Sequence, residues 1–198
     1  MSNKKAAVLL ADGYEEGESL FLADILRRTG VACDTVSVED EMVRGCHDMY
    51  VRADRLIKDV DINEYDMVII PGGMPGAANL AESEPVLAWV RQFMAENKYV
   101  AAICAGPMVL RAAGVSAGRT LTSYPADKYR AMFADANYID DNAQMESMVV
   151  TDGNLITSRG PATTFPFAFR LAEVLEGNVE AVKQGMLYNA LCESIRTA

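Results

Sequence analysis

The run at residues 100–107 (VAAICAGP) constrains the fold of this chain more than any other feature. An apolar, β-prone segment stops at Cys104, and small residues and a proline lead into the helix-like residues 108–113. This pattern predicts a nucleophile elbow, a sharp strand-to-helix turn that lifts one side chain above the end of a sheet. Backbone N–H groups at the start of the new helix would face the sulfur and favour its thiolate. The alternative is a structural cysteine in a strand, because free cysteine is among the most buried residue types.

Short apolar segments alternate with amphipathic ones along the rest of the chain. Such alternation predicts an α/β fold with a mostly parallel sheet that helices cover on both faces. Because no repeat or long linker interrupts the 198 residues, we expect one domain over residues 1–198. We expect strands at residues 6–10, 33–38, 67–70, 100–103, 120–123, 148–151 and 155–157, helices at 18–29, 86–97, 108–113, 165–176 and 179–191, and a small hairpin within 49–60.

Composition excludes several classes of function. The chain has no apolar run of about 18 residues, so we expect no membrane span. The net charge of −10 and the lack of a basic cluster argue against a nucleic-acid partner. The N-terminal residues lack the apolar core of a signal peptide, so we expect a cytoplasmic protein with reduced thiols. The single histidine and four dispersed cysteines (Cys33, Cys46, Cys104 and Cys192) lack the spacing of a zinc site, and we expect no metal or cofactor.

Three loops stand where predicted parallel strands end, which is the edge where such sheets carry their chemistry. They are residues 12–18, residues 71–79 and the elbow at Cys104, and they meet only if their strands are neighbours. The glycines in the second loop would let backbone N–H groups approach an oxyanion beside the sulfur.

Carboxylates gather in the first of these loops. A protonated Glu18 would donate a hydrogen bond to a thiolate, and an ionised Glu18 would accept a proton from a substrate. For Glu15 and Glu16 we favour a structural role, as acids that complement the positive end of a helix dipole. Nothing in the sequence places His47, the single histidine, near Cys104, so a Cys-His triad has little support.

Four stretches together resemble the ThiJ/PfpI superfamily, and within it the DJ-one (Parkinson-associated) and YajL-type branch. They occur in family order over most of the chain, at residues 10–18 (LADGYEEGE), 66–80 (DMVIIPGG, with GAANL at 76–80), 101–107 (AAICAGP) and 155–161 (LITSRGP). The resemblance implies a flavodoxin-like three-layer sandwich and a homodimer. It also implies a role for each matching residue: an oxidisable nucleophile at Cys104, a protonated glutamate at Glu18, a supporting acid at Glu15, an oxyanion pocket from the N–H groups of Gly73 and Ala105, and contact with the partner's site through Arg159, Gly160 and Pro161.

Family activities include cofactor-free glyoxalase, deglycation and redox-regulated chaperoning, and two departures in this chain bear on them. Some members carry a histidine where this chain has Tyr124. Tyrosine has an unperturbed pKa of about 10 and is a poor base, so we expect weak glyoxalase activity. His47 and Asp48 follow Cys46, where relatives often show Ser-Arg, so an interface arginine is missing.

Two classes of function use the same thiol. One is an enzyme that acts on 2-oxoaldehydes or their adducts through a Cys104 hemithioacetal. The other is a non-enzymatic redox sensor or chaperone that responds to oxidation of Cys104 to sulfinate. A cysteine hydrolase is the least supported reading, because Ala105 stands where those relatives have a histidine.

Overall fold

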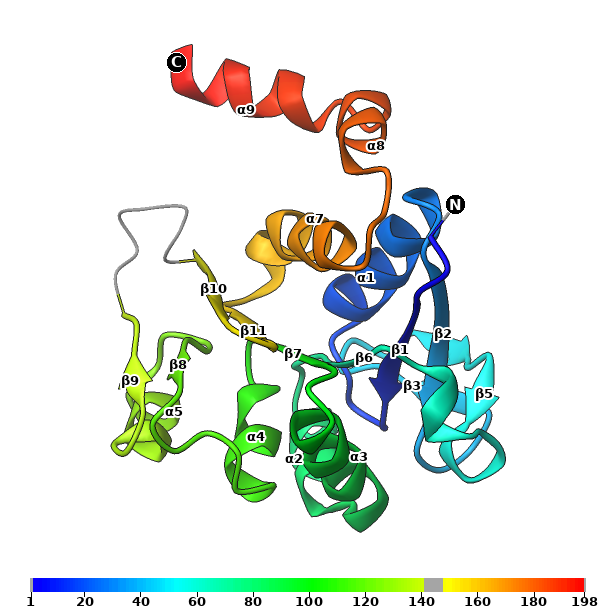
Figure 1. The fold of residues 1–198 in the computed structure, drawn as a ribbon, viewed down its shortest axis with the longest axis vertical. Coiled ribbons are helices and arrows are strands. Elements are labelled where there is room, and N and C mark those ends of the chain that lie inside the picture. Colours follow the sequence, from blue (N-terminus) through cyan, green and yellow to red (C-terminus); the bar gives the residue numbers. More distant parts are fainter. Residues whose placement is uncertain (1, 141–147, 198) are drawn as a thin grey trace.

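A seven-stranded sheet forms the centre of the computed structural model, which describes residues 2–140 and 148–197 (Figure 1). Its strand order is β10-β11-β7-β6-β1-β2-β5. All neighbouring pairs are parallel except β10 and β11, which form an antiparallel hairpin at the edge. The strands are β1 (Lys5–Leu10), β2 (Ala32–Ser37), β5 (Arg55–Leu56), β6 (Met67–Ile70), β7 (Tyr99–Ile103), β10 (Val149–Asp152) and β11 (Leu155–Ser158).

Helices cover both faces of this sheet, which confirms the predicted three-layer α/β sandwich. Helices α1 (Glu16–Arg28) and α7 (Thr164–Val174) pack on one face, and α2 (Gly76–Glu82), α3 (Glu84–Ala95) and α4 (Pro107–Ala112) pack on the other (Figure 1). Successive residues of β1 alternate between the two cores, because strand side chains point to opposite faces. Both cores are apolar, so β1 is a continuous hydrophobic run, as parallel strands buried on two faces usually are. Within the described residues, no helix combines the length and hydrophobicity needed to cross a bilayer.

The segment around residues 42–64 differs from the expected hairpin. The hairpin pairs β3 (Met42–Arg44) with β4 (Tyr50–Arg52), so its first strand precedes the predicted range of 49–60. Strand β5 instead extends the main sheet beside β2, and two 3-10 turns, η1 (Ile57–Asp59) and η2 (Ile62–Glu64), follow it. Polar residues lie between the two hairpin strands, so the alternation of apolar residues did not indicate where the first strand begins.

Three further predictions were wrong in detail. Residues 71–79 were expected to be a loop but contain the start of α2. Residues 179–191 were expected to form one helix, but two helices cover this region, α8 (Val179–Gly185) and α9 (Tyr188–Thr197). Leu187 separates them in the left-handed region at φ 60°, which ends a right-handed helix. The expected strand at 120–123 is the short β8 (Thr120–Leu121), which pairs with β9 (Asn137–Tyr138) outside the main sheet. Short turns α5 (Asp127–Arg130), η3 (Ala131–Phe133) and η4 (Pro161–Thr163) complete the described elements.

Candidate active site

The three predicted loops meet at one edge of the sheet. Strands β1, β6 and β7 are neighbours in the order β7-β6-β1, so their carboxyl ends lie together. The first two loops are bonded directly, because the N–H of Glu15 donates to the carbonyl oxygen of Gly72 at 3.0 Å. The condition that the sequence left open, that these strands be neighbours, is therefore met.

Cys104 occupies the sharp turn between β7 and α4. Its φ of 62° is unusual for a residue with a side chain, and such strain is typical of a nucleophile elbow. Two hydrogen bonds hold the turn: the N–H of Cys104 donates to Ser158 at 3.1 Å, and the N–H of Tyr124 donates to the Cys104 carbonyl at 2.8 Å. Cys104 is neither within the strand nor fully buried, which favours the elbow over a structural cysteine.

Glycine is required where the second loop passes the sulfur. A side chain on Gly72 would bring its Cβ within 2.8 Å of both Cys104 Sγ and Glu18 Oε2. Gly73 has a φ of 86°, and its Cβ would lie 2.3 Å from the backbone nitrogen of Glu15. With hydrogen at both positions, the backbone approaches closely enough for the N–H groups of Gly73 and Ala105 to bond the sulfur of Cys104. These are the two donors that the resemblance implied.

Glu18 lies beneath the sulfur, fully buried in the first turns of α1. Its Oε2 accepts a hydrogen bond from the N–H of Gly72 at 2.7 Å, while Oε1 has no hydrogen-bond partner among the described residues. Burial raises the pKa of Glu18 to about 7, against the opposing effects of the Gly72 N–H and Cys104. A carboxyl of this kind holds a proton near neutral pH and faces the thiol with it.

Burial raises the pKa of the Cys104 thiol, and the charge of an ionised Glu18 raises it further. The N–H groups of Ala105 and Gly73 act in the opposite direction. The sequence argument counted these donors and a protonated Glu18, but it did not count burial, which is the largest cause of the raised pKa. Because the two acids share one buried site, a thiolate at Cys104 requires the proton to sit on Glu18.

The sulfur opens into a pocket of about 350 Å³. Tyr124 borders the pocket with 45 % of its surface exposed, and its ring packs edge-on against Tyr129 at 6.2 Å between centroids. Lys128 adds a positive charge at the rim. Cys46 and His47 also line this pocket, which the sequence did not predict for either residue.

The segment Arg159, Gly160 and Pro161 was expected to reach the partner's site in a dimer. In this chain Pro161 lines the pocket of its own Cys104. Arg159 is buried, and its guanidinium pairs with Asp140 at 3.2 Å. Contact with a second subunit stays a prediction.

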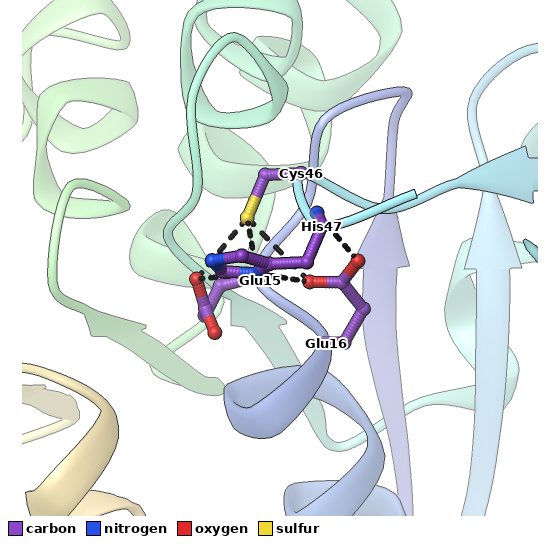
Figure 2. A group of neighbouring side chains, drawn as sticks. All are labelled: Glu15, Glu16, Cys46 and His47. Atoms are coloured by element: carbon purple, nitrogen blue, oxygen red, sulfur yellow. Dashed lines mark hydrogen bonds and ion pairs between the residues drawn. The ribbon is translucent and has the colours of Figure 1, made fainter. Parts of the chain in front are cut away.

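Glu15 and Glu16 hold the Cys46-His47 turn against the start of α1 (Figure 2). Cys46 Sγ lies 3.1 Å from Glu15 Oε2, and His47 Nδ1 lies 2.9 Å from Glu16 Oε2. Burial opposes a charge on Glu16, but the bonds from His47 and Cys46 hold its pKa at about 2. Burial and the two carboxylates raise the pKa of Cys46 to about 12. Glu15 is the N-cap residue of α1 and Glu16 lies in its first turn, where acids complement the helix dipole as expected, although Glu15 makes no capping hydrogen bond.

Known proteins are similar to this chain over nearly its whole length. The *Drosophila melanogaster* protein dj-1beta is 39% identical over 188 residues, covering 93% of this chain and 97% of the relative. Its crystal structure matches with a TM-score of 0.87 over 94% of this chain and 98% of the other. A glutathione-independent glyoxalase of *Caenorhabditis elegans* is 34% identical, covering 97% and 98% of the two chains. A deglycase of *Pyrococcus abyssi* is 30% identical, covering 87% and 99%.

The family model that matches this chain spans residues 4–174, and therefore includes all three loops and the elbow. Together with these relatives, it shows that the chain belongs to the DJ-1/PfpI family.

Proposed function

We propose that this protein is a cofactor-independent glyoxalase or deglycase that acts on 2-oxoaldehydes or their adducts, with Cys104 as the nucleophile. Relatives named as a glyoxalase and a deglycase support this class of activity. The observation that carries the proposal is the pairing of Cys104 with Glu18, a buried carboxyl whose pKa is about 7. An acid with that pKa can both give and take a proton near neutral pH.

The reaction can be followed atom by atom with methylglyoxal as substrate. The Cys104 thiolate attacks the aldehyde carbon, and the resulting oxyanion takes a proton to give a hemithioacetal. A base removes the proton from that carbon, and a proton returns to the neighbouring carbon, which yields a lactate thioester. Water then cleaves the thioester, releasing lactate and the thiol. The net change adds one water to the substrate and needs no external oxidant.

Three groups in or beside the pocket support these steps. Glu18 shuttles the proton, because it lies beside the sulfur and its two protonation states have similar populations near pH 7. The N–H groups of Gly73 and Ala105 stabilise the anionic sulfur. Tyr124 lines the pocket, where its hydroxyl can donate a hydrogen bond to a substrate oxygen but seldom accepts a proton. We therefore expect slow turnover.

A steady-state assay of methylglyoxal conversion to lactate tests this proposal. We expect Cys104→Ser to abolish conversion and Glu18→Gln to reduce it by about a hundredfold or more, which is a typical contribution of general acid–base catalysis. Cys192→Ser is the matched control, because Cys192 lies in α9 and lines a different pocket. Turnover that survives in Cys104→Ser would refute the mechanism.

A redox sensor or redox-regulated chaperone is the second candidate, and the two N–H donors at the sulfur favour it. Donors that stabilise a thiolate also stabilise a sulfinate anion. We expect mild peroxide to convert Cys104 to sulfenic and then sulfinic acid. Cys46 lines the same pocket, so a Cys46–Cys104 disulfide is the competing product to seek in non-reducing peptide maps. Folded wild-type protein with no turnover but an oxidisable Cys104 would favour the sensor.

We also propose that the protein acts as a homodimer. Large apolar side chains are exposed on α1 and on the β3–β4 hairpin, and a second copy would cover them: Leu20, Phe21, Met42, Met49 and Tyr50. Symmetric dimers are the commonest oligomers. Light scattering at micromolar concentration should give twice the chain mass, and Phe21→Glu should shift it towards the monomer. A wild-type monomer would contradict the proposal.

A further inference from the structure

Four side chains from two distant parts of the chain converge beside the Cys104 pocket, and three of them, Glu15, Cys46 and His47, line it. Glu15 caps α1 and Glu16 begins it, while Cys46 and His47 lie in the turn between β3 and β4 (Figure 2). One ligand atom from each residue lies within 4.8 Å of the other three. Cysteine sulfur, histidine nitrogen and carboxylate oxygen are the donors that zinc uses in proteins.

The spacing of these atoms fits the edges of a coordination tetrahedron. Cys46 Sγ lies 3.2 Å from His47 Nδ1, 3.1 Å from Glu15 Oε2 and 3.5 Å from Glu16 Oε2. His47 Nδ1 lies 2.9 Å from Glu16 Oε2 and 3.8 Å from Glu15 Oε2. Zinc bonds of about 2.3 Å to sulfur and about 2.0 Å to nitrogen or oxygen would give edges of roughly 3.3 to 3.5 Å. Five of the six edges therefore lie within about half an ångström of these values, and the sixth, between the two carboxylate oxygens, is at most 4.8 Å, so the side chains must move little to seat the ion.

The surrounding backbone orients these ligands. The Glu16 Oε1 atom accepts the N–H of His47 at 2.8 Å, which leaves Oε2 to face the cluster. The N–H of Cys46 donates to the Tyr14 carbonyl at 2.8 Å, and this bond holds the β3–β4 turn against the loop that precedes α1. Gly45 is needed there, because a Cβ would lie 2.1 Å from Glu16 Oε1. Such outer hydrogen bonds are what hold metal ligands in place.

We propose that Cys46, His47, Glu15 and Glu16 bind one Zn²⁺ ion, through Sγ, Nδ1 and one oxygen of each carboxylate. The thiol proton of Cys46 is released on binding, because the thiolate is the form that coordinates zinc. The ion would neutralise two of the three negative charges in the cluster and tie the β3–β4 turn to α1. The expectation of no zinc site counted only histidine and cysteine spacing, and it overlooked the two carboxylates that the fold brings to this pair.

This site is separate from the proposed catalytic pair. Neither Cys104 nor Glu18 supplies a ligand, although Cys46 and Cys104 line the same pocket. Zinc affinity and turnover are therefore independent measurements, and failure of one proposal leaves the other standing.

Calorimetric titration of the chelator-treated full chain with zinc chloride tests the proposal. We expect one equivalent to bind to the wild type and to Cys104→Ser. Cys46→Ser and His47→Asn should each weaken binding by at least about tenfold, since even outer-shell changes have effects of that size. His47 has an exposed side chain, so its replacement should leave folding intact. Zinc should raise the melting temperature of the wild type but not that of His47→Asn.

Cobalt(II) provides a spectroscopic readout of the same ligands. A thiolate-to-metal charge-transfer band is expected in the wild type, in Cys104→Ser and in Cys192→Ser, and it should be absent from Cys46→Ser. A band that Cys104→Ser removes would place the ion at the catalytic cysteine and overturn the proposal. Absence of stoichiometric binding, or binding that Cys46→Ser and His47→Asn leave unchanged, would also overturn it.

Discussion

Two cysteines share one pocket, and their carboxylate neighbours differ. Cys104 faces Glu18, whose pKa of about 7 lets it hold a proton, and it receives two backbone N–H groups. Cys46 faces Glu15 and Glu16, and Glu16 stays ionised at neutral pH because its pKa is about 2. The pKa of each thiol is raised above its ordinary value. Glu18 can take the proton of Cys104 and relieve the repulsion, whereas Glu16 stays ionised beside Cys46, so proximity to a carboxylate is not what distinguishes a nucleophile.

Alkylation gives the largest expected contrast between the two thiols. Burial and the charges of Glu15 and Glu16 hold the pKa of Cys46 at about 12, so this thiol stays protonated at pH 7, whereas Glu18 can take the proton of Cys104. We expect brief iodoacetamide treatment of the metal-free protein to label Cys104 at least about a hundredfold faster. Mass-spectrometric mapping measures both sites in one sample, with Cys33 and Cys192 as internal references. Earlier labelling of Cys46 would break the comparison.

The stability of the fold should report the raised pKa of Glu18. Its folded pKa of about 7 exceeds the ordinary value of 4.5, so its favourable contribution is complete below pH 4.5 and is lost as the pH rises through 7. From pH 5 to 8, the free energy of unfolding of the wild type should fall relative to Glu18→Gln by roughly 2 to 3 kcal/mol. Urea unfolding at each pH measures this difference.

Glu16→Gln is the matched control for that experiment. The pKa of Glu16 is lowered to about 2, so its contribution is present above pH 4.5 and is lost only as the pH falls towards 2. Its own titration leaves the difference from the wild type flat between pH 5 and 8. A shallow fall is expected only because Glu16 raises the pKa of His47, a contribution that is lost as the pH rises through that pKa. A Glu16→Gln difference as steep as that of Glu18→Gln, or a flat Glu18→Gln one, would contradict the assignment of protonation states.

The pH dependence of Cys104 alkylation tests whether Glu18 and Cys104 titrate as a coupled pair. Loss of the first of the two protons on Glu18 and Cys104 leaves one proton shared between them, so the rate should rise with pH, with a midpoint near 7, and then level off. In Glu18→Gln the thiol titrates alone, and burial should keep the midpoint at or above the ordinary value of about 8.5. At pH 7 the variant should therefore react about tenfold more slowly. An unchanged midpoint would show that the two groups are not coupled.

Tyr124 should have the smallest effect. Tyr124→Phe removes one hydroxyl from the pocket wall, and we expect methylglyoxal conversion to fall about two- to tenfold, the value of one hydrogen bond. Tyr124→His should raise the rate if a missing base limits turnover. An efficient wild-type enzyme that Tyr124→His slows would show that our account of this position is wrong.

Much of the fold could be predicted because it depends on local patterns. The apolar runs of β1, β6 and β7 and the small residues around Cys104 specify buried strands and a tight turn, whatever lies elsewhere in the chain. The break at Leu187 and the hairpin register around Met42 were mispredicted, because each depends on one backbone choice that side-chain periodicity does not encode.

The sequence by itself determined the strand–elbow–helix unit at Cys104 and the order of the loops around it. The tertiary structure alone decided which acid meets which thiol. Glu15 and Glu16 meet Cys46 and His47 across about thirty residues, and only the packing of the β3–β4 turn against α1 joins them. The physical reason is that hydrogen bonds and burial set the charge state of a carboxyl. Hydrogen bonds and burial both act over a few ångströms, so the charge state of a carboxyl depends on its neighbours in space and not on its neighbours in sequence.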